Sequence, residues 1–151
     1  MSPVRAPIPS TVVGENYVRF KHESLEFLFT HLVDVRPIFG DDLEALLIFI
    51  AISRFYLRDE RANPDADNAE LGVNRRLTLS RISEMTGIPR ETTRRKLKLL
   101  QDKGLLEKGP YDNWQMTTRD GQPVIRTSYP EVWQKEMQRL VKMVRALKDY
   151  V

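Results

Sequence analysis

The sequence contains no cysteine and only two histidines, His22 and His31, among its 151 residues. The absence of cysteine excludes disulfides, a thiolate nucleophile and a zinc finger, and two histidines argue against a histidine-rich metal site. The chain has no glycine-rich phosphate loop and no spacing of a nucleophile with a base. We therefore expect neither enzymatic activity nor a cofactor.

The sequence also lacks a long apolar run. The longest, from Ala45 to Ile52, is much shorter than the about 20 residues that a helix needs to cross a bilayer. The N-terminal segment lacks the apolar core of a secretion signal, so we expect a cytoplasmic protein without a membrane partner. Hydrophobic residues make up 41% and charged residues 30% of the chain, which is typical of a soluble globular protein.

Positive charge is present but unevenly distributed. Nine lysines and arginines lie between Arg75 and Lys103, against three acidic residues, whereas the net charge of the whole chain is only +3. Acidic residues elsewhere, including those of 59–70, balance the local excess. Such a concentration is expected of a surface that binds phosphates, although a solvated helix face would show it too.

Two helices are predicted in the N-terminal part of the chain. Apolar residues at helical spacing predict the first over 24–35, before Pro37. The second helix, capped by Asp41 or Asp42, is predicted to run to about Arg58. This second helix is apolar nearly all round, which favours a central position with partners on several sides.

A shorter helix is predicted to begin near Thr78 or Ser80, because either side chain can cap it. We expect its Ile82 and Met85 to face the core. Gly87 then suits the left-handed position that ends such a helix and starts a tight turn. These residues predict the first half of a helix-turn-helix.

The second half is a cationic helix predicted over 89–103, with Pro89 in its first turn. At 100° per residue, one face gathers the residues expected to pack inward, namely Thr93, Leu97 and Leu100. A second face, roughly 140° wide, gathers charged residues expected to point outward. These residues are Arg90, Glu91, Arg94, Arg95 and Lys98.

After Gly104 the pattern changes from helical to extended. Residues 105–108 and 114–117 predict two strands joined by a turn. Asp120 and Gly121 predict another tight turn, before a further strand over 124–126. Either of these two hairpins is a candidate for a wing beside the cationic helix.

The C-terminal segment predicts a long helix that begins at Pro130. Its apolar residues are spaced by alternating intervals of four and three, which is a heptad pattern. The pattern predicts a dimer seam, with packing onto the same chain as the alternative. The predicted seam residues are Trp133, Met137, Leu140, Val144, Leu147 and Val151.

The order of helix, glycine turn, cationic helix and hairpin resembles the winged helix-turn-helix superfamily of bacterial transcription regulators over about 41–127. The cationic helix resembles the recognition helix of the cyclic-AMP receptor/Fnr class, whose Arg-Glu-Thr-x-x-Arg pattern is met at Arg90, Glu91, Thr92 and Arg95. Arg94 departs from that class, in which a small residue is common. The predicted helices leave no room for a cyclic-nucleotide domain, and the flanking helices are closer to MarR-type or IclR-type regulators.

The resemblance implies an α+β fold that is mainly α-helical, with a small β-hairpin wing and flanking N-terminal and C-terminal helices. It implies double-stranded DNA as the partner, with the helix over 89–103 in the major groove. Arginine matches guanine O6/N7 and a carboxylate accepts from cytosine N4, so the expected base contacts are Arg90, Glu91 and Arg95. The residues expected at the DNA backbone are Ser80, Arg81, Thr92, Arg94, Lys98 and Lys103. The residues expected on a wing are Lys108, Tyr111, Asn113 and Arg119.

We divide the chain into a flexible arm over 1–16, a helical arm over 17–40, a winged helix over 41–128 with a polar loop over 59–76, and a C-terminal helix over 129–151. The predicted function is a sequence-specific transcription regulator that binds an inverted repeat as a homodimer. An architectural, replication or partition protein on DNA and a winged-helix protein-interaction module are the alternatives. A small-molecule effector pocket lined by aromatic residues is a weaker prediction, because such residues more often form the core. These residues are Phe20, Phe27, Phe29, Phe39, Phe49, Phe55 and Tyr56, with His31 beside them.

Overall fold

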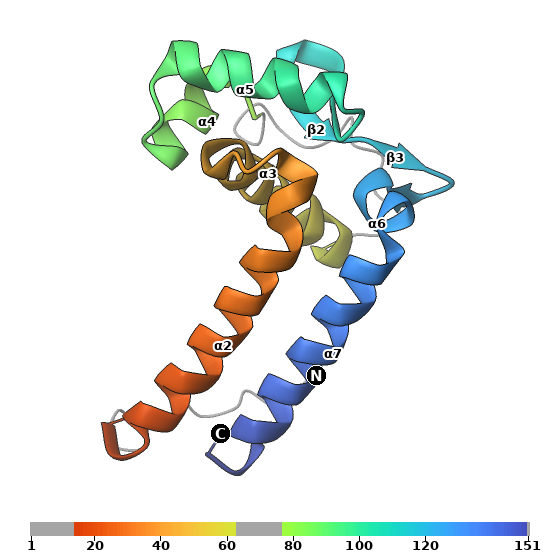
Figure 1. Cartoon of the computed structure of the whole chain (residues 1–151). Helices are drawn as coiled ribbons and strands as arrows, with labels where there is room; N and C mark the ends of the chain where they lie inside the picture. The colour runs from red at the N-terminus through yellow and green to blue at the C-terminus, as the bar shows by residue number, and fades with distance from the viewer. Residues whose placement is uncertain (1–13, 63–76, 151) are drawn as a thin grey trace. The chain divides into compact units, whose positions relative to one another are not determined.

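A computed structural model describes residues 14–62 and 77–150 of the chain, which divide into two compact units (Figure 1). The central unit comprises the described residues of 36–129. The helical pair comprises the described residues up to Val35 together with those from Pro130 onward. We describe each unit by itself.

The central unit is mainly helical, with two short hairpins near its end. Its elements, in chain order, are η1 (Arg36–Phe39), α3 (Leu43–Ala62), α4 (Leu79–Thr86), α5 (Arg90–Asp102), β1 (Leu106–Lys108), η4 (Pro110–Asp112), β2 (Trp114–Met116), β3 (Thr118–Arg119), β4 (Gln122–Pro123) and α6 (Val124–Ser128). Strand β1 pairs antiparallel with β2, and β3 pairs antiparallel with β4. The expected fold class, an α+β winged helix, is confirmed by this order of elements.

The core of the central unit forms where α3 contacts α4, α5 and β2. The rings of Phe39 and Phe49 pack at 5.2 Å between centroids. The largest side chains that are almost completely buried come from five of its elements. They are Phe39, Ile48, Ile52, Ile82, Leu97, Leu100, Leu106 and Thr93. Helix α5 is therefore fixed from below by a packed core.

Asp42 begins α3 and also ties it to α5. Its Oδ1 accepts a hydrogen bond from the backbone N–H of Ala45 at 3.0 Å, which is an N-cap contact. Its Oδ2 lies 2.5 Å from Lys96 Nζ, and Glu44 Oε2 lies 3.9 Å from the same nitrogen. Burial raises the pKa of the Asp42 carboxyl, but the Lys96 hydrogen bond, the Ala45 N–H and the Lys96 charge outweigh it, so the pKa is lowered.

Helix α3 differs from its prediction in two ways. It continues to Ala62, so the polar loop predicted from 59 begins later, and residues 63–76 lie outside the described part of the chain. It is also not buried all round, because Leu43 is 69% exposed and Leu47 is 44% exposed. Helix α3 has apolar residues on all sides, as the sequence shows, but they are not all buried. The described neighbours of α3 cover only part of its circumference.

Other boundaries also differ from the expectations. Met85 is 39% exposed rather than in the core, because Ile82 takes the buried position of α4. Pro89 precedes α5 as its N-cap and is not within its first turn. Val124, expected in a strand, opens the short helix α6, because the second hairpin already closes at Pro123.

The helical pair consists of α2 (Tyr17–Val35) and α7 (Pro130–Leu147), followed by η5 (Lys148–Tyr150). The two long helices lie side by side and run antiparallel (Figure 1). Helix α2 begins earlier than predicted, and the ring of Phe27 stacks on that of His31 at 5.7 Å. Arg139 of α7 forms an ion pair with Asp34 of α2, which links the two helices.

The helical pair buries little of its apolar surface. Only Val35 of α2 is buried, and no residue of α7 is buried among those that the structure describes. Of the predicted seam, Trp133, Met137, Leu140 and Leu147 are half-buried and Val144 is 62% exposed, while Val151 lies outside the described residues.

Candidate nucleic-acid interface

A network of hydrogen bonds holds the turn between α4 and α5. Thr78 caps α4 by accepting from the backbone N–H of Arg81 at 3.3 Å. Gly87 ends α4 with φ = 71°, a left-handed conformation that glycine adopts without steric cost. Thr86 Oγ1 donates to the Ile82 carbonyl at 2.8 Å and accepts from the backbone N–H of Ile88 at 3.3 Å. The angle between the two helices is therefore fixed by local chemistry.

The carbonyl of Ile88 joins the two helices directly. It accepts from Ser83 Oγ of α4 at 2.6 Å and from Thr93 Oγ1 of α5 at 3.2 Å. Thr93 is fully buried, and this bond satisfies its hydroxyl, which explains a polar residue on the inner face of α5. Leu97 and Leu100, fully buried beside it, complete the inward face that the sequence predicted.

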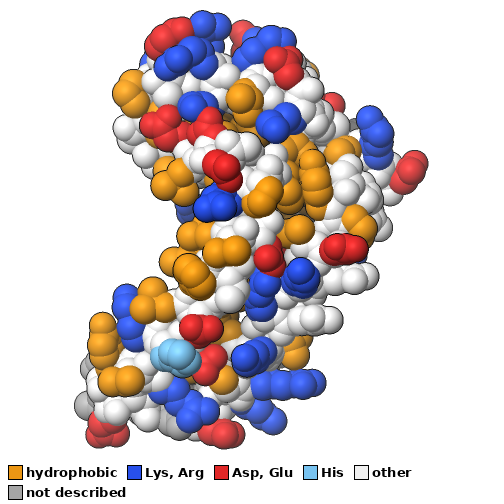
Figure 2. All heavy atoms as spheres, viewed as in Figure 1, with side chains coloured by type: hydrophobic (Ala, Val, Ile, Leu, Met, Phe, Trp, Pro, Cys, Tyr) orange, Lys and Arg blue, Asp and Glu red, His pale blue; other side chains and the backbone are white. Residues whose placement is uncertain are grey.

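The outer face of α5 carries the charges. Arg90, Glu91, Arg94, Arg95 and Lys98 are all exposed, as predicted. Figure 2 shows Lys and Arg side chains gathered over the end of the central unit that carries α4 and α5. Lys96 is different, because it is half-buried and turned toward Asp42 of α3. The helix therefore presents one cationic face and packs the opposite face into the core.

Two ion pairs lie within this face. Arg94 Nη2 donates to Glu91 Oε1 at 2.6 Å and Arg94 Nε donates to Glu91 Oε2 at 3.1 Å. The hydrogen bond from Arg94 lowers the pKa of the Glu91 carboxyl and raises that of the Arg94 guanidinium. Lys98 Nζ donates to Asp102 Oδ1 at 2.9 Å. The structure thus joins Glu91 to Arg94, two residues for which separate contacts had been predicted.

The remaining predicted contacts of α5 lie at its middle and end. Arg95 Nη2 donates to Thr92 Oγ1 at 3.5 Å, a long and weak bond that leaves the guanidinium at the surface. Lys103 forms the exposed C-cap of the helix. Both cations therefore face solvent on the same helix as the predicted base contacts.

On α4, Arg81 does not extend freely from its helix. Its guanidinium lies 5.3 Å from the centroid of the Phe55 ring of α3, and the guanidinium of Arg58 lies 4.4 Å from the same ring. Cation–π contacts of this kind hold a cation in place at a surface. Ser80, the other predicted backbone contact of α4, is half-buried in its first turn.

The hairpin of β1 and β2 follows α5 directly. Strand β1 contacts α5 and strand β2 contacts α3, and the backbone N–H of Trp114 donates to the carbonyl of Leu77 at 2.9 Å. This hairpin therefore belongs to the core of the central unit. The hairpin of β3 and β4 turns at Asp120 and Gly121, and its Arg119 is exposed.

The tip of the first hairpin has an unusual backbone. Tyr111 and Asp112 have φ values of 68° and 56°, which non-glycine residues rarely adopt, and the Tyr111 side chain is 69% exposed. A Cβ at Gly109 would lie 2.6 Å from the side-chain oxygens of Asn113 and Gln115, so these side chains would have to shift. That Asn113 oxygen is buried and has no hydrogen-bond partner among the residues that the structure describes. Lys108 is exposed and lies 5.5 Å from the Trp114 ring centroid.

Residues 72–110 match the family model described as the IclR helix-turn-helix domain. This segment contains α4, the Gly87 turn, α5 and β1, so the helix-turn-helix of this chain is similar to that of the IclR family. The match confirms the expected resemblance and supports a DNA-binding transcription regulator. No curated protein and no solved structure gives a significant match to the chain.

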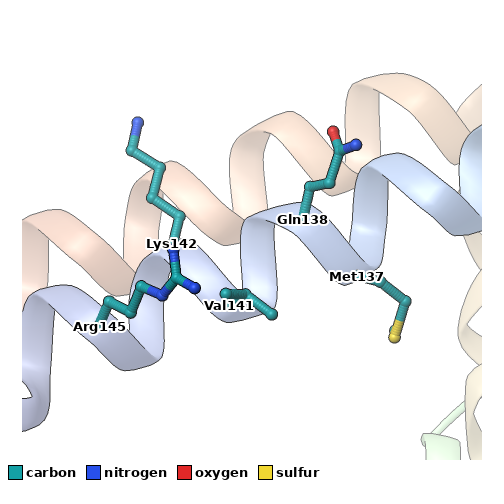
Figure 3. Close-up of a pocket in the computed structure, with 5 residues that line it drawn as sticks. All are labelled: Met137, Gln138, Val141, Lys142 and Arg145. Atoms are coloured by element: carbon teal, nitrogen blue, oxygen red, sulfur yellow. The ribbon is translucent and has the colours of Figure 1, made fainter.

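The aromatic residues named as a candidate effector pocket are divided between the two units. Phe39 and Phe49 pack in the core of the central unit, whereas Phe27 and Phe29 belong to the helical pair. A shallow pocket on α7 is lined by residues of that helix alone (Figure 3): Met137, Gln138, Val141, Lys142 and Arg145. No helix among the described residues is both long and apolar enough to span a membrane.

Sequence reasoning missed two features of this interface. It did not foresee that Phe55 would hold Arg81, because the two residues lie far apart in the sequence and meet only after folding. It also treated Glu91 and Arg94 separately, although residues three apart on a helix are neighbours and opposite charges at this spacing pair readily. The second feature was therefore within reach of the sequence.

Proposed function

We propose that this protein is a sequence-specific regulator of transcription that binds double-stranded DNA as a homodimer, with α5 in the major groove. The observation that carries the proposal is the division of α5 into a locked inner face and an exposed cationic outer face. A helix that is fixed in this way can present side chains to base edges with little further loss of conformational entropy on binding.

Within this proposal, Arg90, Glu91 and Arg95 contact bases. A guanidinium binds guanine O6/N7 through two hydrogen bonds, and each such pair discriminates against a wrong base by about 1–3 kcal/mol. The residues proposed to contact the DNA backbone are Ser80, Arg81, Thr92, Lys98 and Lys103. The exposed Lys108, Tyr111 and Arg119 of the hairpins are candidates for further contacts outside the major groove.

The homodimer is supported by the apolar surface of the helical pair. At about 100° per residue, Val18, Leu25 and Phe29 fall within an arc of about 40° on α2. All three are exposed, and they lie opposite Phe27, which faces α7 across a pocket that Arg139 also lines. Apolar residues at intervals of four and seven lie on one face and are typical of a helix that packs against another helix.

A second copy of the chain is the occupant that fits this surface. Helix α7 carries its own exposed apolar residues, Val141 and Val144, beside the half-buried Met137. Two such pairs related by a two-fold axis would bury these faces in a bundle of four helices. A two-fold dimer of a helix-turn-helix protein reads an inverted repeat, whose half-sites lie about 34–36 Å apart.

The first test is the selection of binding sites by the full-length protein from randomised duplex DNA. We expect an enriched inverted repeat with G·C pairs in each half-site. Salt-sensitive binding without an enriched sequence would favour an architectural protein instead. Failure to retain DNA at low salt would favour a protein-interaction module and overturn the proposal.

The second test uses variants on the selected site. Arg90→Ala and Arg95→Ala should each weaken binding about 5–150-fold and relax the preference at one position. Lys135→Ala, which removes an exposed cation from α7, is the matched control for loss of charge. The solution mass at micromolar concentration tests the dimer, and a strictly monomeric mass would remove it.

A further inference from the structure

Arg94 binds both carboxylate oxygens of Glu91, whereas an arginine that only contacts a DNA phosphate needs no such partner. Both carboxylate oxygens of Glu91 accept from Arg94, one from Nη2 at 2.6 Å and one from Nε at 3.1 Å. Arg94 thus binds the carboxylate in a bidentate manner, and the two parallel hydrogen bonds fix the plane of the carboxylate as well as its position. Each oxygen retains a second lone pair with which to accept from another donor.

In water this pair is weak, because both side chains are largely exposed, 69% for Glu91 and 61% for Arg94. Exposed ion pairs on a helix contribute little to its stability, because water screens their attraction. The pair therefore has little value for folding. Its value rises at a DNA surface, where water is excluded and charges interact through a medium of lower dielectric constant.

An unpaired carboxylate on this face would oppose DNA binding. Phosphates repel it, and removing its charge from water without a partner is costly. Arg94 neutralises the charge and leaves outward acceptor positions free. The hydrogen bond from Arg94 also lowers the pKa of the Glu91 carboxyl, which favours its ionised form.

We propose that Arg94 is a positioning residue that holds the Glu91 carboxylate against the amino group of a cytosine in the major groove, and that Arg94 does not bind a phosphate. The proposal rests on the proposed DNA-binding function and changes the role of Arg94 from the backbone contact that the sequence suggested. Cytosine N4 is the donor that a carboxylate recognises in the major groove, whereas guanine offers only acceptors there.

The test compares variants of the full-length protein on the selected site and on sites changed at each position of the half-site. Glu91→Ala should lose the preference for C·G at one position of the half-site. Arg94→Ala should lose the preference at that same position. The preference should fall by about 5–150-fold in both variants. The Glu91→Ala/Arg94→Ala double variant should lose no more discrimination than Glu91→Ala alone, because the two residues act as one unit.

Salt dependence separates positioning from phosphate binding. Removal of one phosphate contact lowers the slope of log K against log salt by about one and weakens binding equally on all sequences. Lys98→Ala is the matched control on the same face, and we expect it to show this behaviour with its base preference intact. Arg94→Ala should leave the slope of log K against log salt as it is in the parent protein, because no phosphate contact is removed.

Two outcomes would overturn the inference. A lowered slope with unchanged base preference would identify Arg94 as a phosphate contact, and an Arg94→Ala variant with unchanged affinity and preference would give it no role. Both outcomes leave the parent protein bound to its selected site, so they are distinct from a failure of the proposed function. Circular dichroism would confirm that each variant keeps its helix content.

Discussion

The central unit and the helical pair use their apolar residues in opposite ways. In the central unit, short elements converge on one core, and residues such as Ile82, Leu97 and Leu106 are almost fully buried. In the helical pair, two long helices touch along one side and leave residues such as Val18 and Phe29 exposed on the other. The central unit has a core of its own, whereas we propose that the apolar faces of the helical pair pack against a second copy of the chain.

This difference assigns separate tasks to the two units. A rigid core beneath α5 preserves the arrangement of the side chains that we propose to read DNA. Exposed apolar faces are costly in isolation and mark contact sites for another protein. Substitution of an apolar residue should therefore weaken folding in the central unit, whereas in the helical pair it should weaken association with another chain.

The largest effect is expected from Leu97→Ala in the central unit. The substitution leaves a cavity beneath α5, so the free energy of unfolding should fall by about 2–5 kcal/mol. Leu99→Ala deletes the same atoms from the exposed side of the same helix and should cost less than about 1 kcal/mol. Urea unfolding followed by circular dichroism measures both, and equal losses would contradict a packed core below α5.

A smaller effect is expected from Asp42→Ala, which removes both the cap of α3 and the ion pair with Lys96. We expect a loss of about 2 kcal/mol in the free energy of unfolding. Asp42→Asn is the matched control, because asparagine still caps a helix but carries no charge, so its loss should be smaller.

The ion pair also predicts a dependence on pH. The pKa of Asp42 is lower in the folded chain than its unfolded value of about 4, so its charge stabilises the fold above that pH. This contribution is lost as the pH falls through the folded pKa. The difference between the parent protein and Asp42→Asn should therefore be full at pH 7 and shrink at pH 3, and a constant difference would contradict the ion pair.

Next in size is Phe29→Ala in the helical pair, where we expect a change in association. The dimer dissociation constant should rise about tenfold, which corresponds to about 1.4 kcal/mol. Phe29→Leu keeps an apolar side chain at this position and should change it much less. Sedimentation equilibrium over a range of concentrations measures the constant, and equal dissociation constants for all three proteins would exclude this face from the interface.

Much of the central unit could be predicted from the sequence because its signals are local. The left-handed Gly87, the cap at Thr78 and the two faces of α5 each depend on residues within a few positions of one another. The candidate DNA contacts on α5 were chosen from the same pattern, and the exposure of this face agrees with it.

Burial was harder to predict because it depends on distant neighbours. The apolar pattern of α3 did not reveal that Leu43 and Leu47 would be exposed, since that depends on which elements pack against it. The outward apolar face of α2 was missed for the same reason. The stacking of Arg81 on Phe55 likewise joins residues from two helices, and no pattern in the sequence predicts that contact.

The smallest effect is expected from Thr78→Ala, which removes the N-cap of α4. It tests how far a short helix of the central unit depends on its cap and how far on packing, which is what we propose stabilises the helical pair. Helix α4 has only eight residues, too few to be stable alone, so it depends on its cap and on Ile82 in the core. Loss of the cap should lower the free energy of unfolding by about 1 kcal/mol, whereas Thr78→Ser, which keeps a capping hydroxyl, should leave it nearly unchanged. Equal stability of the two variants in urea unfolding would show that core contacts alone hold α4. In that case the short helices of the central unit would depend on packing as completely as we propose for the long helices of the helical pair.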